Sequence, residues 1–292
     1  IATSAQTGFS ISDILAAPFS EELTPAPAAN RFAWVMNARG LRNVWASEAP
    51  SFRARQLTQY KDDDGQEIGQ LVWTPDAASL YYTRSGDLSM RREVPNPTSY
   101  FERPVQSVWK IAYAGGAPIR IGEGHSPAVS SKGSVAYVKG NEVWRDGKKW
   151  FATRGGISQL TWSPDGTRLT CVVSRGDHAF IAVTSNDHLN FLDPSVDSDS
   201  SPVWSPDGRT IAFIRNAAST RAFQFGPVRT AHPWAIHIAD PSNGKSRRIF
   251  RADEGPGSAF HAVVADRQLF WAANNRLFFP WEKSGWTQLY SV

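Results

Sequence analysis

The stretch from Leu160 to Val173, LTWSPDGTRLTCVV, returns between Pro202 and Arg215 as PVWSPDGRTIAFIR. In each copy a tryptophan precedes a Ser-Pro-Asp-Gly turn, and alternating apolar residues follow the turn. Proline presets the backbone dihedral φ, aspartate bonds nearby backbone amides, and glycine accepts a positive φ. Leu169, Cys171 and Val173 alternate with their neighbours in the period of two that is typical of a strand. Each copy therefore predicts a β-hairpin with one buried face.

Weaker copies of this pattern mark further units along the chain. Taking the turn proline or its aligned residue as the reference, the marks are Pro27, Pro75, Ser131, Pro164, Pro206 and Ala265. Their intervals average about 48 residues, within the range of solenoids and propellers. Further strand pairs, such as LRNVWASE and HPWAIHIADPSNGKSRRIF, lie between the hairpins. Two hairpins per unit predict a four-stranded antiparallel sheet, the blade of a β-propeller, which protects strand edges by packing blades around a ring.

The sequence thus predicts an all-β fold, a β-propeller of about six four-stranded antiparallel blades. One propeller domain is expected over residues 1–292, with a short helix near residues 11–16. The closing stretch SGWTQLYSV is interpreted as the first outer strand of an unfinished blade, so we expect a truncated propeller with an incomplete last blade. A β-sandwich is disfavoured because its strands do not recur as a full repeated unit. A β-helix would show a shorter period.

Composition limits the classes of function. Hydrophobic residues make up 41% and charged residues 20% of the 292, as in ordinary globular proteins. The net charge of +4 comes from scattered Lys and Arg residues, which argues against a nucleic-acid surface. The single cysteine, Cys171, excludes a disulfide framework and is interpreted as a small buried hydrophobe. No apolar run reaches the roughly 18 to 20 residues that span a bilayer.

Neither a catalytic centre nor a metal site is predicted from these residues. Asp177-His178 and Asp187-His188 are neighbours in sequence, and adjacent side chains on a strand point to opposite faces. The acidic stretch at residues 62–67 lacks the alternate spacing of calcium ligands, so we interpret it as a solvated loop. No cofactor is expected.

Two long insertions between strands are candidates for ligand binding. REVPNPTSYFERPVQS contains three prolines, which mark it as an excursion from the sheet, and it carries Glu102 and Arg103. NAASTRAFQFGPVRTAHPW, residues 216–234, is too long for a tight hairpin and carries Arg221 and Arg229. Excursions from a rigid scaffold are where binding residues concentrate. We therefore name these four side chains as candidate substrate-binding residues, with an ordinary surface loop as the alternative for each insertion.

The two WSPDG copies, followed by PWAIHIADPSNGKSRRIF, resemble the propeller repeats of the translocation protein TolB and of prolyl-oligopeptidase-family serine peptidases. The opening part, with AWVMNARGLRNVWASE, resembles the start of the propeller in dipeptidyl-peptidase-IV-like and acylaminoacyl-peptidase-like enzymes. The likeness covers nearly the whole chain through short, degenerate motifs. It implies a propeller that filters peptides by size, followed by a C-terminal α/β-hydrolase domain with a Ser-Asp-His triad.

The chain departs from the complete enzyme of this kind. It contains no G-x-S-x-G nucleophile elbow, so the hydrolase domain is expected to be absent from the 292 residues. In dipeptidyl-peptidase-IV-like enzymes a glutamate pair holds the substrate's amino terminus. The pair Glu21-Glu22 lies outside the expected mid-propeller position, and we do not assign it this role.

The resemblance therefore implies a non-catalytic, substrate-gating domain of a serine peptidase that removes dipeptides or acylated residues from short peptides. Its expected partners are its own hydrolase domain and peptide substrate, with no nucleic acid and no membrane span; association of identical chains stays open. The segment alone is expected to be inactive. The alternative is a stand-alone TolB-like propeller that binds a protein partner. We expect a periplasmic or secreted location, with the cytoplasm as the alternative.

Overall fold

The structure, a computed structural model, describes residues 10–86, 94–97, 99–186, 188–218, 232–255, 258–263, 265 and 267–292. The chain divides into two compact units, Ile1–His125 and Ser126–Val292. Regular structure in the described residues is almost entirely antiparallel strand, and the expected all-β class is confirmed. No helix in this described part is long and apolar enough to cross a membrane.

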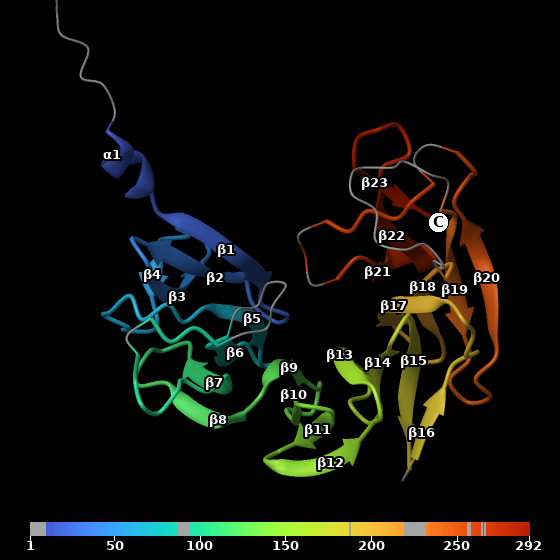
Figure 1. Cartoon of the computed structure of the whole chain (residues 1–292), viewed down its shortest axis with the longest axis horizontal. Coiled ribbons are helices and arrows are strands. Elements are labelled where there is room, and N and C mark those ends of the chain that lie inside the picture. The colour runs from blue at the N-terminus through green and yellow to red at the C-terminus, as the bar shows by residue number, and fades with distance from the viewer. Residues whose placement is uncertain are drawn as a thin grey trace, which may run out of the picture. The chain divides into compact units, whose positions relative to one another are not determined.

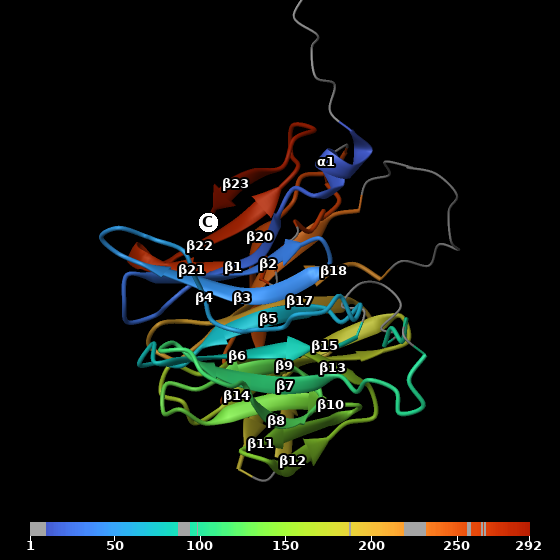
Figure 2. The same ribbon diagram turned by 90° about the vertical axis from the view of Figure 1, so that its left-hand side faces the viewer.

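The first unit contains two four-stranded antiparallel sheets, each with its strands in chain order (Figure 1). The first sheet consists of β1 (Phe19–Pro25), β2 (Arg31–Ala38), β3 (Leu41–Glu48) and β4 (Arg55–Gln56). The second consists of β5 (Ile68–Trp73), β6 (Ser79–Arg84), β7 (Ser107–Ala112) and β8 (Ile119–Glu123). The two sheets share one hydrophobic core, and β5 lies against the first sheet (Figures 1 and 2).

A short helix, α1 (Ile11–Leu15), precedes β1. The hydroxyl of Ser10 accepts the backbone N–H of Asp13, and the Asp13 carboxylate accepts the backbone N–H of Ser10. This reciprocal capping box satisfies two N–H groups that a helix start leaves without partners, and it explains why so short a helix forms here.

The second unit contains the remaining sheets (Figure 1). The third sheet consists of β9 (His125–Val129), β10 (Val135–Lys139), β11 (Glu142–Arg145) and β12 (Lys148–Ala152). The fourth consists of β13 (Gly156–Trp162), β14 (Leu169–Arg175), β15 (His178–Ser185) and β16 (His188–Phe191). The fifth consists of β17 (Ser198–Trp204), β18 (Ile211–Asn216), β19 (Trp234–Ala239) and β20 (Ser246–Arg251). A single parallel pair, Ala179 of β15 with Ser198 of β17, connects the fourth and fifth sheets.

The sixth sheet contains three strands in the described residues. They are β21 (Phe270–Ala272), β22 (Arg276–Trp281) and β23 (Gln288–Ser291), with a 3₁₀ turn, Ala273–Asn275, between the first two. Within the stretch SGWTQLYSV, β23 pairs with β22 and so adds a strand to a sheet that begins with β21. The interpretation of this stretch as the first strand of a blade is wrong, because two strands of the same sheet precede it, while the expectation that the last blade is incomplete stays a prediction. The described residues between Ser258 and Leu269 form no strand.

The repeated Ser-Pro-Asp-Gly turn is held by its own side chains. The hydroxyl of Ser163 donates to the carboxylate of Asp165 at 2.5 Å, and Asp165 also accepts the backbone N–H and hydroxyl of Thr167. These hydrogen bonds lower the pKa of Asp165 to about 2, and the bond from Ser163 has the largest effect. Gly166 takes a φ of +66°, a left-handed conformation that costs any residue with a Cβ. The second copy, residues 205–208, has the equivalent Ser-to-Asp bond.

In three sheets the tryptophan before the turn connects the sheet to the preceding one. In three pairs of neighbouring sheets its indole N–H donates to a carbonyl oxygen in the first strand of the preceding sheet: Trp73 to Thr24 at 3.2 Å, Trp162 to Ala128 at 3.0 Å and Trp204 to Thr161 at 3.3 Å. The acceptors occupy the same place, one residue before the end of their strands. The repeat therefore uses tryptophan for its N–H as well as for its apolar ring.

A residue in the left-handed conformation lies three positions before the end of the first strand in five sheets. These residues are Glu22, Gln70, Ser126, Gln159 and Ser201, with φ between 52° and 60°. In four of the five strands the register shifts at this point, which defines a β-bulge.

The bulge side chains reach the next sheet. The carboxylate of Glu22 accepts the backbone N–H of Gln70 at 2.8 Å, and the side-chain oxygen of Gln159 accepts that of Ser201 at 2.6 Å. Each bond therefore connects one bulge to the next. Strained backbone persists only where its surroundings fix it, and these bonds provide that fixation.

In both Ser-Pro-Asp-Gly hairpins the second strand, β14 or β18, is buried on both faces, which corrects the expectation of one buried face. In β14, Leu169, Cys171 and Val173 pack in a cluster that includes the third sheet, while Val172 packs in a cluster that includes the fifth. The physical reason is that the fourth sheet lies between the third and the fifth. Burial raises the pKa of the Cys171 thiol to about 12, so its interpretation as a small hydrophobe is confirmed.

We expect Trp204→Phe to lower the free energy of unfolding by about 0.5 to 1.5 kcal/mol, because it removes the indole donor to the Thr161 carbonyl, which keeps the Thr170 hydroxyl as a donor, while an aromatic ring is kept. Urea unfolding followed by circular dichroism measures this change. Trp286→Phe is the matched control, because Trp286 is 79% exposed, and it should change stability by less than about 0.5 kcal/mol. Equal effects of the two substitutions would show that the indole bond does not hold the sheets together.

Candidate functional site

The structure describes two of the four residues predicted to bind substrate. Glu102 and Arg103 lie in the segment between β6 and β7, where both are exposed and neither belongs to a strand. Arg221 and Arg229 lie outside the described residues. The peptide-binding role of these four residues stays a prediction.

The acidic stretch at residues 62–67 is engaged by arginines. The carboxylate of Asp64 accepts a hydrogen bond from Arg84 at 2.5 Å, and that of Asp63 lies 3.5 Å from an Arg42 nitrogen. Among the residues that the structure describes, no group of three or more His, Cys, Asp or Glu side chains could hold a metal ion. These carboxylates therefore anchor a loop to its neighbouring strands.

Asp177 and His178 do meet, contrary to the expectation that they point to opposite faces. Asp177 lies in the turn before β15, and its Oδ1 is 3.0 Å from Nδ1 of His178. The period-two argument fails because only His178 belongs to the strand. Asp177 is exposed, so the pair is a surface contact at a turn.

A buried ion pair in the fifth sheet was not predicted. Arg215 on β18 donates to both oxygens of Asp199 on β17, at 2.7 and 2.9 Å, and Asp199 is 1% exposed. The same guanidinium donates to the carbonyl and the carboxylate of Asp193. In the sequence, Arg215 occupies a core position of an alternating strand. Only the pairing of β17 with β18, which places Asp199 opposite Arg215, shows its partner.

This ion pair continues into a chain of hydrogen bonds across the sheet. The hydroxyl of Ser246 donates to Asp193 at 2.5 Å, and Nδ1 of His237 lies 3.0 Å from that hydroxyl oxygen. Since the serine proton is directed at Asp193, the histidine N–H donates to Ser246. A catalytic triad needs the histidine to accept the serine proton and the aspartate to hold the histidine. Serine, histidine and aspartate are all present here. Because the serine donates to the aspartate and not to the histidine, it is not activated as a nucleophile.

The pKa values in this network follow from burial and charge. Burial raises the pKa of Asp199 to about 6 against the opposing bonds of Arg215, so the carboxylate is ionised at neutral pH. Burial and then the charge of Arg215 lower the pKa of His237, which favours its neutral form. The network therefore links four strands through hydrogen bonds, and within it Arg215 and Asp199 are buried while Asp193 is partly exposed.

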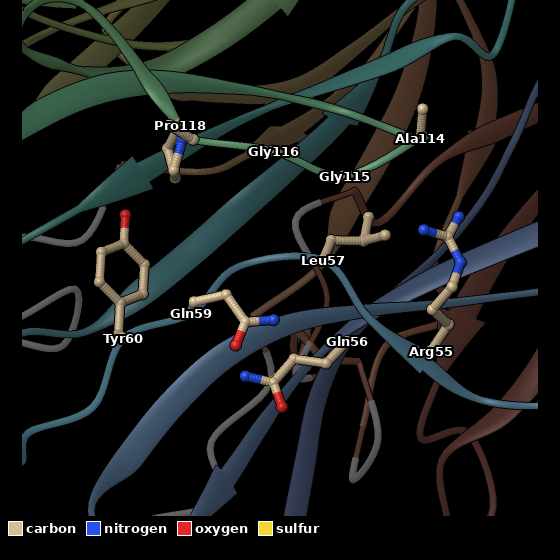
Figure 3. Close-up of a pocket in the computed structure, with 10 residues that line it drawn as sticks. Arg55, Gln56, Leu57, Gln59, Tyr60, Ala114, Gly115, Gly116 and Pro118 are labelled. Carbon is tan, nitrogen blue, oxygen red and sulfur yellow. The ribbon is translucent and has the colours of Figure 1, made fainter.

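An open pocket of about 510 Å³ lies in the first unit. One side is the chain that forms and follows β4, and the other is the turn between β7 and β8 (Figure 3). Its lining consists of Arg55, Gln56, Leu57, Gln59, Tyr60, Ala114, Gly115, Gly116, Ala117 and Pro118. The pocket thus combines one cation, two carboxamides, an apolar floor and a glycine-rich wall. No sequence motif pointed to it, because its two sides lie more than 50 residues apart.

Comparison with known proteins places the fold. No family model matches the sequence, and no curated protein matches it. A puromycin-hydrolyzing peptidase of Mycobacterium tuberculosis is 13% identical with a TM-score of 0.60, over 93% of this chain and 43% of that one. A puromycin hydrolase is 15% identical with a TM-score of 0.58, over 91% and 42%. Hydrazine synthase of Kuenenia stuttgartiensis is 16% identical with a TM-score of 0.58, over 95% and 80%.

These neighbours are propellers, and they match almost the whole of this chain. The chain is a β-propeller. The expected fold is confirmed, and so, at the level of the fold, is the resemblance to the propeller domains of prolyl-oligopeptidase-family peptidases. The propeller described here spans less than half the length of each of the two peptidases.

We expect Asp199→Ala to destabilise the propeller by about 3 kcal/mol, because it leaves the Arg215 charge buried without its main partner. Asp253→Ala, which removes an exposed surface ion pair with Lys283, should cost less than about 0.5 kcal/mol. Chemical denaturation of the two variants measures the difference. The double variant Asp199→Leu with Arg215→Met should be more stable than Asp199→Ala, since it removes both charges. A single variant as stable as the wild type would show that the pair is not a structural tie.

Proposed function

We propose that this propeller is the non-catalytic, substrate-gating domain of a serine peptidase of the prolyl-oligopeptidase type. The proposal rests on how much of this propeller, and how much of the similar peptidase, the structural match covers. Over 90% of the propeller matches a peptidase, and the match occupies only 42 to 43% of that peptidase. This ratio is what one domain of a two-domain enzyme would give.

The interior of the propeller supports a non-catalytic role. In the described residues the side chains around Arg215 bind one another, and the serine of this cluster donates to an aspartate instead of to a basic histidine. The nucleophile in this proposal is a serine of a following α/β-hydrolase domain, activated by a histidine of that domain. The propeller contributes rigidity, because its sheets are joined by hydrogen bonds between bulges and from tryptophans. A rigid wall excludes folded proteins and admits short peptides.

Peptide ends are the chemical features that such a gate would recognise. A free amino terminus needs a carboxylate partner, and a free carboxyl terminus needs a guanidinium. Glu102 and Arg103, on an exposed segment, and Arg221 and Arg229 are the side chains that we propose for these contacts. The removal of dipeptides or acylated residues, and a periplasmic or secreted location, belong to this proposal.

A fluorophosphonate probe, which labels activated serines, tests the proposal. The 292-residue chain should remain unlabelled and should not hydrolyse Ala-Pro or acyl-peptide chromogenic substrates. The full-length product of the gene should be labelled, and it should cleave short peptides while sparing the same bonds in a folded protein.

Two outcomes would contradict the gating role. Labelling of the 292-residue chain itself would place a nucleophile in the propeller. A full-length product that is not labelled and contains only propeller sequence would instead support the stand-alone, TolB-like protein-binding propeller.

A further inference from the structure

The pocket of the first unit has no part in the gating role. We propose that it binds the C-terminal carboxylate of an extended peptide. The inference does not rest on the peptidase proposal, since a propeller that binds protein partners could use the same site.

Arg55 is the group that would hold the carboxylate. Its Nη2 donates to the backbone carbonyl of Tyr113 at 2.5 Å, and its guanidinium carbon lies 4.6 Å from the centre of the Tyr113 ring. These contacts fix an otherwise exposed side chain, so little conformational freedom remains to be lost on binding. A guanidinium held in place matches the planar geometry of a carboxylate, which it binds through two parallel hydrogen bonds.

Arg55 is not neutralised by an ion pair inside the described part of the protein. The acidic side chain of the neighbouring network, Glu48, is bound by Arg31 at 2.8 Å and by the Tyr113 hydroxyl at 3.1 Å. Within the described residues Arg55 itself forms no ion pair within 4.0 Å. The pKa of Glu48 is lowered first by its bond to Arg31 and, to a smaller extent, by the charge of Arg55. Arg55 thus lies near a carboxylate that it does not bind, and its side chain lines the pocket.

The glycine turn opposite adds backbone donors. Gly115 and Gly116 take φ values of +93° and +115°, a conformation that residues with a Cβ rarely adopt. A Cβ on Gly115 would lie 3.9 Å from Nη1 of Arg55, so the turn passes beside the guanidinium. The N–H of Gly115 is used within the turn. Those of Gly116 and Ala117 have no hydrogen-bond partner in the described part of the chain, and they are available to an anion.

The rest of the lining suits a peptide better than an inorganic anion. The side-chain N–H of Gln56 donates to the Thr58 carbonyl at 2.7 Å, which leaves its oxygen as an acceptor for a peptide N–H. Gln59 is exposed and offers a second carboxamide, and Leu57 is 1% exposed and forms an apolar floor. The single cation matches a ligand with one negative charge, the two carboxamides match the amide groups next to that charge, and the apolar floor matches a side chain. The volume lies in the range of small-ligand sites, about 300 to 1,000 Å³.

Calorimetric titration of the 292-residue chain with trialanine, with its C-terminal amide and with acetate tests the site. Trialanine should bind, and the amide and acetate should each bind at least about tenfold more weakly, because each lacks one half of the recognised group. Arg55→Ala should weaken trialanine binding by about tenfold or more. Arg55→Lys should restore only part of it, since an ammonium lacks the planar fork.

Matched variants separate binding from folding. Arg53→Ala removes an exposed arginine two residues away that does not line the pocket, and it should leave trialanine binding unchanged. Gln59→Ala changes an exposed side chain and should weaken trialanine binding without altering the melting temperature. It keeps the test valid if Arg55→Ala fails to fold after losing its bond to Tyr113.

Several results would overturn the inference. These are equal affinity for trialanine and its amide, acetate binding as tightly as trialanine, inorganic phosphate binding more tightly than trialanine, or Arg53→Ala and Arg55→Ala having the same effect. The absence of saturable binding at about 10 mM trialanine would do the same, since that limit corresponds to less binding free energy than one well-formed site provides.

Discussion

The hydrogen bond from a tryptophan N–H to a carbonyl of the preceding sheet is the interaction on which this propeller depends. It stands at the same place in three pairs of sheets, and bonds from bulge side chains to backbone amides lie beside it. A hydrophobic face alone does not fix how one sheet sits on the next, because apolar contact has no direction. The indole N–H and the bulge supply that direction.

The same stacking decides where polar groups can function. Middle strands such as β14 and β18 are buried on both faces, so a charge on them must be paired internally. Arg215 and Asp199 meet this condition, and their network contributes stability instead of chemistry. Groups free to meet a ligand are left at the rims, where turns and outer strands end. Arg55 belongs to the edge strand β4, and Gly115 and Gly116 belong to the turn between β7 and β8.

A fold of this kind is compatible with several roles. The similar structures include peptidases and a hydrazine synthase, which share the scaffold and differ in their chemistry. Function therefore has to be argued from sites, and from what accompanies the propeller in the whole protein. The gating role and the carboxylate pocket follow from two separate observations, and either can stand without the other.

The sequence by itself determined the hairpin, its turn and its repetition, because a Ser-Pro-Asp-Gly bend and a period-two strand are local features. It also indicated that Cys171 is buried, from the apolar run around it. It did not reveal that strand β14 has two buried faces, that Glu22 bonds to Gln70, or that Arg215 meets Asp199. Those facts depend on which sheet lies beside which, and no local pattern encodes the partner of a side chain. The pocket is of the same kind, since Arg55 and Gly115 become neighbours only when two sheets pack together.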